Sequence, residues 1–259
     1  MRGQLPRERM RRIEDAVPSP PDRLRKIFPR WADWFVGSEA RTEPALRGLW
    51  DGWHLLCEAK LALIESEACW VWYSELRNPP NETSAKYFCR YYLDDAALRL
   101  AASSWHMLSS LREHLDFKLG KAEGRKPLLA RTIDALERKK HRSPVLGWLR
   151  GLNSNHAWQQ CSSYRDRWCH NRRPALAGVG SILTFSRLLV SPGAQGFSFG
   201  TAQPADHTIA ELRPVFRDAY IALLGVYSKL MRLMSPRNNS LRAVKSMLVP
   251  PRKDAPLRW

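Results

Sequence analysis

Residues 44–76, PALRGLWDGWHLLCEAKLALIESEACWVWYSEL, contain the strongest indication of the fold class. Apolar residues recur in this stretch every three or four positions, which is the spacing of one face of an α-helix. Pro44 suits the first position of a helix, because its fixed φ fits there and its missing N–H would have no helical partner. Asn78, Pro79 and Pro80 follow and end the pattern. The sequence therefore predicts one long helix over the whole stretch.

A second long helix is predicted from about Glu82 to Phe117. The residues of this helix that we expect to face the core are Tyr87, Tyr91, Asp94, Leu98, Ala101, Trp105 and Leu108. A short turn rich in proline joins the two long helices, so they should run antiparallel as a hairpin.

Shorter helices are predicted at 128–139, at 144–152 and at 158–171. Asn153 or Asn155 is expected to cap the last of these, because an asparagine side chain can accept a hydrogen bond from a free N–H of the first turn. The three segments should pack on the hairpin.

A last long helix is predicted to begin near Thr208, where Thr208 and Glu211 have the spacing of a capping box. Apolar residues then alternate at three and four positions as far as Leu233, and Pro214 should kink this helix or shift its start. Residues 178–204 are rich in Gly, Pro and Ser and are expected to be irregular. The fold class is therefore all-α: a helical bundle with two long antiparallel helices and a long C-terminal helix.

Basic segments flank this bundle at both ends of the chain. Residues 1–43 are predicted to form a basic N-terminal arm, flexible over the first twenty residues, in which apolar residues between 27 and 35 dock on the core. Residues 44–235 form the helical domain, and residues 236–259 form a flexible basic C-terminal tail.

The charge of the chain indicates a polyanionic partner. The 259 residues include 42 Lys and Arg against 25 Asp and Glu, a formal net charge of +17. Nucleic acid is the commonest partner of so basic a protein, and an anionic membrane surface is a rarer one. Five cysteines without a CxxC pair favour a reducing cytoplasm over a disulfide framework.

Several classes of function lack support in the sequence. Neither GxGxxG nor GxxxxGK[ST] occurs, so nothing indicates nucleotide binding by those loops, and no cofactor is expected. The spacing of His and Cys residues does not match a common metal-binding motif, so no metal site is expected. No segment has the length and apolarity of a membrane-spanning helix.

The most informative segment for chemistry is 163–174, SYRDRWCHNRRP, which combines four arginines with one histidine and one aspartate. Arg165 shares a helical stripe with apolar residues, so its guanidinium needs an anion or a carbonyl as a partner. Asp166 and His170 are four residues apart, so the carboxylate could orient the imidazole. Arg165 and His170 are about 140° apart around an ideal helix. They would converge only if the helix ends or distorts near His170.

Those residue types suit the cleavage of a phosphodiester. RNA cleavage needs a base for the ribose 2′-OH proton, an acid for the leaving oxygen and a fixed cation for the charge on the phosphorane. Imidazole titrates near neutral pH and a guanidinium binds phosphate oxygens in pairs, so this scheme requires no metal. The alternative is that the segment is only the solvated basic face of a helix.

Arg165-Asp166 followed by His170 resembles the signature of the HEPN superfamily (higher eukaryotes and prokaryotes nucleotide-binding domains). The order of the predicted elements is also similar, with long antiparallel helices first and the motif on a later helix of an all-α bundle. Residues 91–105 resemble the corresponding helix of a subgroup of bacterial HEPN proteins. The resemblance covers about residues 44–235, and its motif helix is the specific part.

The resemblance implies a metal-independent endoribonuclease that leaves a 2′,3′-cyclic phosphate and acts as a toxin or a phage-defence effector. Arg165 and His170 would be the catalytic pair, and Asp166 would orient them. A homodimer is expected, because HEPN domains commonly share one cleft between two motifs. RNA is the expected substrate, and an antitoxin or another defence-system protein is a further expected partner.

Other residues are assigned to the site by charge and proximity or as support. The residues placed at the substrate phosphates are Arg167, Asn171, Arg172 and Arg173. Asp94 and Tyr164 are assigned as supporting residues. Asp94 lies on the predicted apolar stripe, so its carboxylate needs a partner: either Arg165, which would place it at the site, or Arg99 or a tyrosine hydroxyl, which would make it structural.

Two rival interpretations stay open. A non-catalytic helical module that binds RNA or DNA, or a subunit of a larger complex, would use the same positive charge without an active site. A protein that binds membrane surfaces would also use this positive charge, although no strongly amphipathic basic helix or lipidation motif supports that interpretation.

Overall fold

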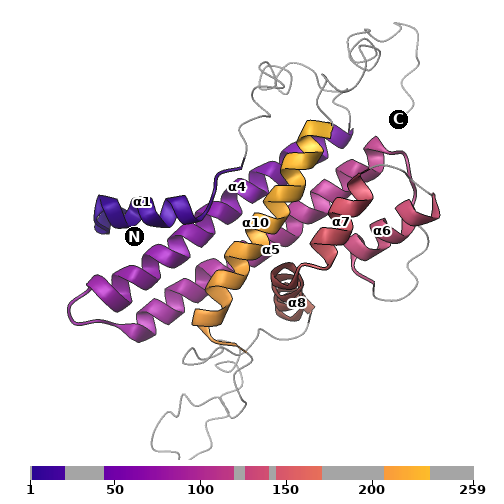
Figure 1. The fold of residues 1–259 in the computed structure, drawn as a ribbon. Coiled ribbons are helices and arrows are strands. Elements are labelled where there is room, and N and C mark those ends of the chain that lie inside the picture. Colours follow the sequence, from indigo (N-terminus) through magenta and orange to yellow (C-terminus); the bar gives the residue numbers. More distant parts are fainter. Residues whose placement is uncertain (1, 21–43, 120–125, 140–143, 171–206, 234–259) are drawn as a thin grey trace, which may run out of the picture.

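The computed structural model describes residues 2–20, 44–119, 126–139, 144–170 and 207–233. All regular secondary structure in these ranges is helical, which confirms the predicted all-α class (Figure 1). Predictions for the other residues, including the docked apolar segment at 27–35, the irregular region at 178–204 and the basic C-terminal tail, lie outside the described ranges.

The two long predicted helices form the hairpin on which the rest of the bundle is built. Helix α4 spans Pro44–Val71 and continues as a π-helical segment, η2, over Trp72–Leu76. Helix α5 spans Glu82–His114 and runs back beside α4 (Figure 1). Asn81 caps α5 by accepting a hydrogen bond of 2.8 Å from the backbone N–H of Ser84.

The face of α5 that packs into the core differs from the predicted one. The prediction of Tyr87, Tyr91 and Trp105 as core residues was wrong, because their exposed fractions are 47%, 59% and 55%. The buried face of α5 includes the small residues Ala85, Cys89, Ala96, Ala97 and Ser103. Small side chains allow the backbones of two helices to approach closely, so this face suits the contact with α4 better than a row of aromatic rings does.

Helices α4 and α5 approach each other closely at Gly52. Ser103 of α5 donates a hydrogen bond of 2.7 Å to the carbonyl of Gly52. A Cβ atom at position 52 would overlap the hydroxyl of Tyr227 and lie 3.0 Å from the carbonyl oxygen of Ser103. Glycine is therefore required at position 52, where α4 contacts both α5 and the helix that carries Tyr227.

Helix α10, Ile209–Leu233, crosses α4 and α5 and supplies Tyr227 (Figure 1). The predicted capping box is present: Glu211 accepts from the N–H of Thr208 at 2.8 Å, and Thr208 accepts from the N–H of Glu211 at 3.1 Å. These bonds lower the pKa of Glu211. Helix α10 begins at Ile209 as its cap requires, and it continues through Pro214.

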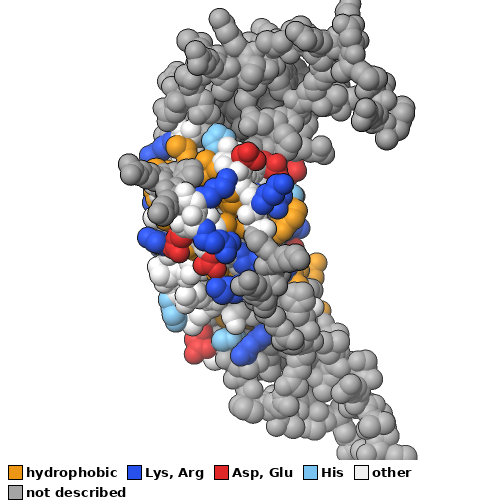
Figure 2. Space-filling view, turned by 90° about the vertical axis from the view of Figure 1, so that its right-hand side faces the viewer, with side chains coloured by type: hydrophobic (Ala, Val, Ile, Leu, Met, Phe, Trp, Pro, Cys, Tyr) orange, Lys and Arg blue, Asp and Glu red, His pale blue; other side chains and the backbone are white. Residues whose placement is uncertain are grey.

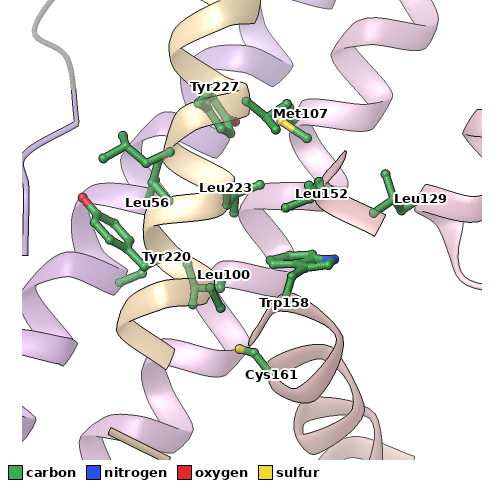
Figure 3. Close-up of a cluster of buried hydrophobic side chains, with 14 of the residues drawn as sticks. Leu56, Leu100, Met107, Leu129, Leu152, Trp158, Cys161, Tyr220, Leu223 and Tyr227 are labelled. Carbon is green, nitrogen blue, oxygen red and sulfur yellow. The ribbon is translucent and has the colours of Figure 1, made fainter. Parts of the chain in front are cut away.

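Three shorter helices cover one end of the hairpin: α6 (Leu128–Arg138), α7 (Val145–Asn153) and α8 (His156–His170). Their apolar residues join the same core as the long helices. Figure 3 shows Leu129 of α6, Leu152 of α7 and Trp158 of α8 on the side of the core next to Leu223 and Met107. The core is therefore continuous from α4 to α8.

The N-terminal segment is helical and lies against the bundle, where the sequence suggested an arm without regular structure over the first twenty residues. A short 3₁₀ segment, η1, spans Arg2–Gln4, and helix α1 spans Arg7–Ala16. Val17 after this helix is fully buried. Tyr220 donates a hydrogen bond of 2.6 Å to the carbonyl of Pro18. Basic residues dominate this segment, but its few apolar residues pack on the core and on α4.

Within the described ranges, no helix combines the length and the apolarity needed to cross a membrane.

Candidate active site

Helix α8 carries the sequence motif, and Asn155 fixes where it begins. The side chain of Asn155 accepts a hydrogen bond of 2.9 Å from the backbone N–H of Trp158. Of the two predicted caps, Asn155 is therefore the one that the structure shows. The helical backbone then continues without a break to His170.

The inner face of α8 is apolar and holds the helix on the core. Trp158, Cys161 and Tyr164 are buried at successive three-residue steps. Burial raises the pKa of the Cys161 thiol to about 12, so this cysteine is a packing residue and not a nucleophile at neutral pH. The ring of Tyr164 meets the ring of Phe216 edge to face, with centroids 5.1 Å apart.

Tyr164 also links α8 to α5 through a buried polar contact. Its hydroxyl donates a hydrogen bond of 2.5 Å to Oδ1 of Asp94, and Nε of Arg90 lies 3.8 Å from Oδ2 of the same carboxylate. The side chains of Arg90 and Asp94 are almost completely buried. Among the partners considered for Asp94, the tyrosine hydroxyl is correct, and Arg99 binds Asp95 and Glu58 instead. Asp94 therefore positions α8.

Arg165 points its charge toward a neighbour on its own helix. Nη1 of Arg165 lies 2.9 Å from Oδ1 of Asp166, and about one third of the Arg165 side chain is exposed. Its Nε is buried and has no hydrogen-bond partner among the residues that the structure describes. An unsatisfied buried donor costs free energy, so an acceptor beside α8 would be bound favourably.

A groove of about 540 Å³ runs between α8, α5 and the start of α6. Its apolar wall is formed by Ala101, Trp105, Leu108, Leu128 and Leu129. Its polar wall is formed by Ser162, Ser163, Arg165, Asp166 and Arg167. The groove therefore offers an apolar surface on one side and two guanidinium groups on the other.

The structure brings some predicted site residues together and leaves others undescribed. Arg165, Asp166 and Arg167 line the groove, and Asp94 and Tyr164 lie buried behind it. The side chain of His170, and all of Asn171, Arg172 and Arg173, lie outside the described part of the chain.

Sequence reasoning missed the groove itself. Trp105 was predicted to lie in the core, and the residues at the start of α6 were given no role in the site. The signal that could have found Trp105 is the presence of two competing faces on α5, one of small residues and one of aromatic residues. A helix beside one partner buries the face that packs closely, which leaves the aromatic face to solvent or a ligand.

The basic surface near this end of the molecule is partly neutralised by acids. Figure 2 shows Lys and Arg side chains interspersed with Asp and Glu on one side of the protein. Arg150 lies 2.7 Å from Glu137, and Lys126 lies 3.0 Å from Asp134. Exposed pairs of this kind contribute little to stability and are screened by salt, so they leave the surface available to a polyanion.

Among the residues that the structure describes, no three His, Cys, Asp or Glu side chains gather in a way that could hold a metal ion. Comparison of the chain with protein-family models, with curated proteins and with solved structures finds no match in any of the three.

Proposed function

We propose that the protein is a metal-independent endoribonuclease of the HEPN type, with its active site at the α8 groove. The observation that carries the proposal is the placement of Arg165, Asp166 and Arg167 along one wall of an open groove, on the helix that ends at His170. A guanidinium wall suits the phosphate groups of RNA, and the histidine supplies a group that titrates near neutral pH.

In the proposed reaction, the ribose 2′-oxygen attacks the adjacent phosphorus and the 5′-oxygen of the next nucleotide leaves. His170 takes the proton from the 2′-OH as a base, and the imidazolium that forms gives a proton to the leaving 5′-oxygen as an acid. Arg165 stabilises the negative charge that grows on the phosphorane oxygens. The products are a 2′,3′-cyclic phosphate and a 5′-hydroxyl, and no water enters this step.

Asp166 prepares Arg165 for this role. Its Oδ1 lies 2.9 Å from Nη1 of Arg165 and so holds the guanidinium beside the groove. Because Nε is buried and Nη1 is paired with Asp166, Nη2 is then the nitrogen that meets a phosphate. Arg167 extends the cationic wall, and Asn171, Arg172 and Arg173 continue the same basic run of sequence.

A second copy of the chain is part of the proposal. Arg165 and His170 are five positions apart, and on an unbroken α-helix two such residues lie about 140° apart around the axis. Arg165 of one copy would therefore pair more easily with His170 of the other, as in HEPN dimers that share one cleft. A role as a toxin or a phage-defence effector, with an antitoxin or another defence-system protein as partner, rests on the resemblance to the HEPN superfamily.

The alternative is a helical module that binds nucleic acid without cleaving it. The observation that favours it is the groove itself, whose apolar and cationic walls need no histidine in order to bind a nucleotide.

Cleavage of a mixed RNA pool in EDTA tests the proposal, with wild type, Arg165→Ala, His170→Ala and the control Arg217→Ala compared. Arg217 is an exposed arginine of α10 that does not line the groove. We expect wild type and the control to cut alike and leave cyclic-phosphate ends, and the two site variants to lose at least about 100-fold in rate. RNA that is bound by all four proteins but cut by none would favour the binding module. Equal cutting by all four would overturn the assignment of this site.

A further inference from the structure

We infer that Trp105 is a substrate-positioning residue on whose indole ring one unpaired base of the RNA stacks, while the phosphate beside that base contacts Arg167. The inference rests on the proposed function and specifies which form of RNA the groove takes. It assigns a role to a residue outside the catalytic motif, on a different helix.

The exposure of Trp105 is the first observation. Its exposed fraction is 55%, although it is a large apolar residue within the 33-residue helix α5. Among the residues that the structure describes, its ring contacts the ring of its sequence neighbour His106, edge to face with centroids 5.0 Å apart. An exposed indole in a concave site marks a place where a ligand can cover apolar surface.

The opposite wall supplies the second observation. Arg165 and Arg167 line the same groove from α8. A nucleotide has a flat aromatic base at one end and an anionic phosphate at the other, so it matches an apolar wall facing a cationic wall. Ser104, Ser162 and Ser163 also line the groove and offer hydroxyls to the edges of a base.

The size of the groove selects unpaired RNA. Its volume of about 540 Å³ is typical of a pocket for one small ligand and suits a base with its sugar and phosphate. A base within a duplex has both faces covered by its neighbours, so it cannot stack on a side chain unless it is first unpaired. The groove therefore favours single strands, loops and bulges over double-stranded RNA.

Binding measurements test the role of Trp105 independently of cleavage. The proteins carry His170→Ala, so that the RNA stays intact, and the probe is a fluorescein-labelled single strand of about eight nucleotides, measured by anisotropy. Trp105→Ala should weaken binding by about 5- to 150-fold, the loss expected for one stacked base. Trp105→Phe keeps a flat ring and should recover most of that affinity.

Tyr91→Ala is the matched control. Tyr91 lies on the same helix and is more exposed than Trp105, but it is fourteen residues away, about 21 Å along α5, and does not line the groove. The control should bind the single strand as tightly as the parent, and Trp105→Ala should have little effect on the weaker binding of a duplex of the same sequence.

Failure of this inference can be told apart from failure of the proposed function. If wild type cuts RNA in EDTA and Trp105→Ala cuts with the same KM and the same affinity, the stacking role is wrong and the ribonuclease stands. If nothing cuts but Trp105→Ala binds weakly, the stacking role stands in a binding module. Sedimentation measures the oligomeric state of Trp105→Ala. If that state is altered while the RNA affinity is unchanged, Trp105 is a contact between copies of the chain and the inference is overturned.

Discussion

The hydroxyl of Tyr164 on α8 donates a hydrogen bond of 2.5 Å to Oδ1 of Asp94 on α5, a residue seventy positions earlier in the chain. Both side chains are buried, and Arg90 lies 3.8 Å from the other oxygen of the same carboxylate. A hydrogen bond to a charged group is stronger than one between neutral groups. The contact therefore fixes the helix that carries the motif at a set position on the hairpin.

Substitution of either partner of this contact should destabilise the fold, and the loss in the free energy of unfolding should differ between the two partners. Tyr164→Phe removes one hydrogen bond to a charged acceptor and should lower the free energy of unfolding by about 1.5–3 kcal/mol. Asp94→Ala should cost about 3–5 kcal/mol, because Arg90 also loses its carboxylate. Urea unfolding followed by circular dichroism measures both values.

The double variant completes the test. Because Tyr164 and Asp94 touch, the two losses should not add, and the coupling free energy should be about 0.5–3 kcal/mol. Strictly additive losses would mean that the hydrogen bond does not contribute to the stability of the folded protein.

Gly52→Ala should destabilise the bundle by about 1–3 kcal/mol, because the new methyl group overlaps the buried hydroxyl of Tyr227 and approaches the carbonyl of Ser103. Tyr227→Phe removes the hydroxyl, so the double variant should recover part of the loss. The midpoint of thermal unfolding measures both effects.

Gly225→Ala is the control for that experiment. Gly225 is an exposed residue of α10, and a methyl group at this position would meet nothing within 4 Å beyond the neighbouring backbone of its own helix. Alanine is the better helix former, so this variant should be more stable by about 0.5–1 kcal/mol. A similar loss from both glycine substitutions would show that the close approach at Gly52 is not the cause.

Arg167→Gln should weaken the binding of single-stranded RNA and make it less sensitive to salt. One lost phosphate contact should reduce the slope of log affinity against log salt by about 0.7. Arg217→Gln makes the same change of charge in the smaller cleft between α1, α4 and α10, so its slope should stay that of wild type. Equal slopes for both variants and for wild type would remove Arg167 from the RNA interface.

The elements of the fold that local sequence governs could be predicted. The spacing of apolar residues in 44–76, the turn at Pro79 and Pro80 and the capping box at Thr208 each act over a few positions along the chain. The helices they predict are present with boundaries shifted by a few residues. Such signals succeed because helix starts and ends depend on nearby backbone groups.

The errors have a different origin. The sequence predicts a flexible arm over the first twenty residues because their charge suggests solvation, yet α1 is present and its few apolar residues pack on the core and on α4. Trp105 was predicted to be buried because it lies on an apolar stripe, yet α4 packs against the small residues of the other face. Each outcome depends on which surface of another helix is available.

From the sequence by itself it follows that the bundle is helical, that its long helices begin and end within a few residues of the observed bounds, that the chain is strongly basic and that Arg165, Asp166 and His170 share one helix. These properties follow from local spacing, capping and composition. Three relationships depend on how the helices pack: Asp94 binds Tyr164, the hydroxyl of Tyr227 lies against Gly52, and Trp105 lines the same groove as Arg165 and Arg167. Those relationships join residues far apart in the chain, and close packing of helices selects them from many arrangements that the same periodicity permits.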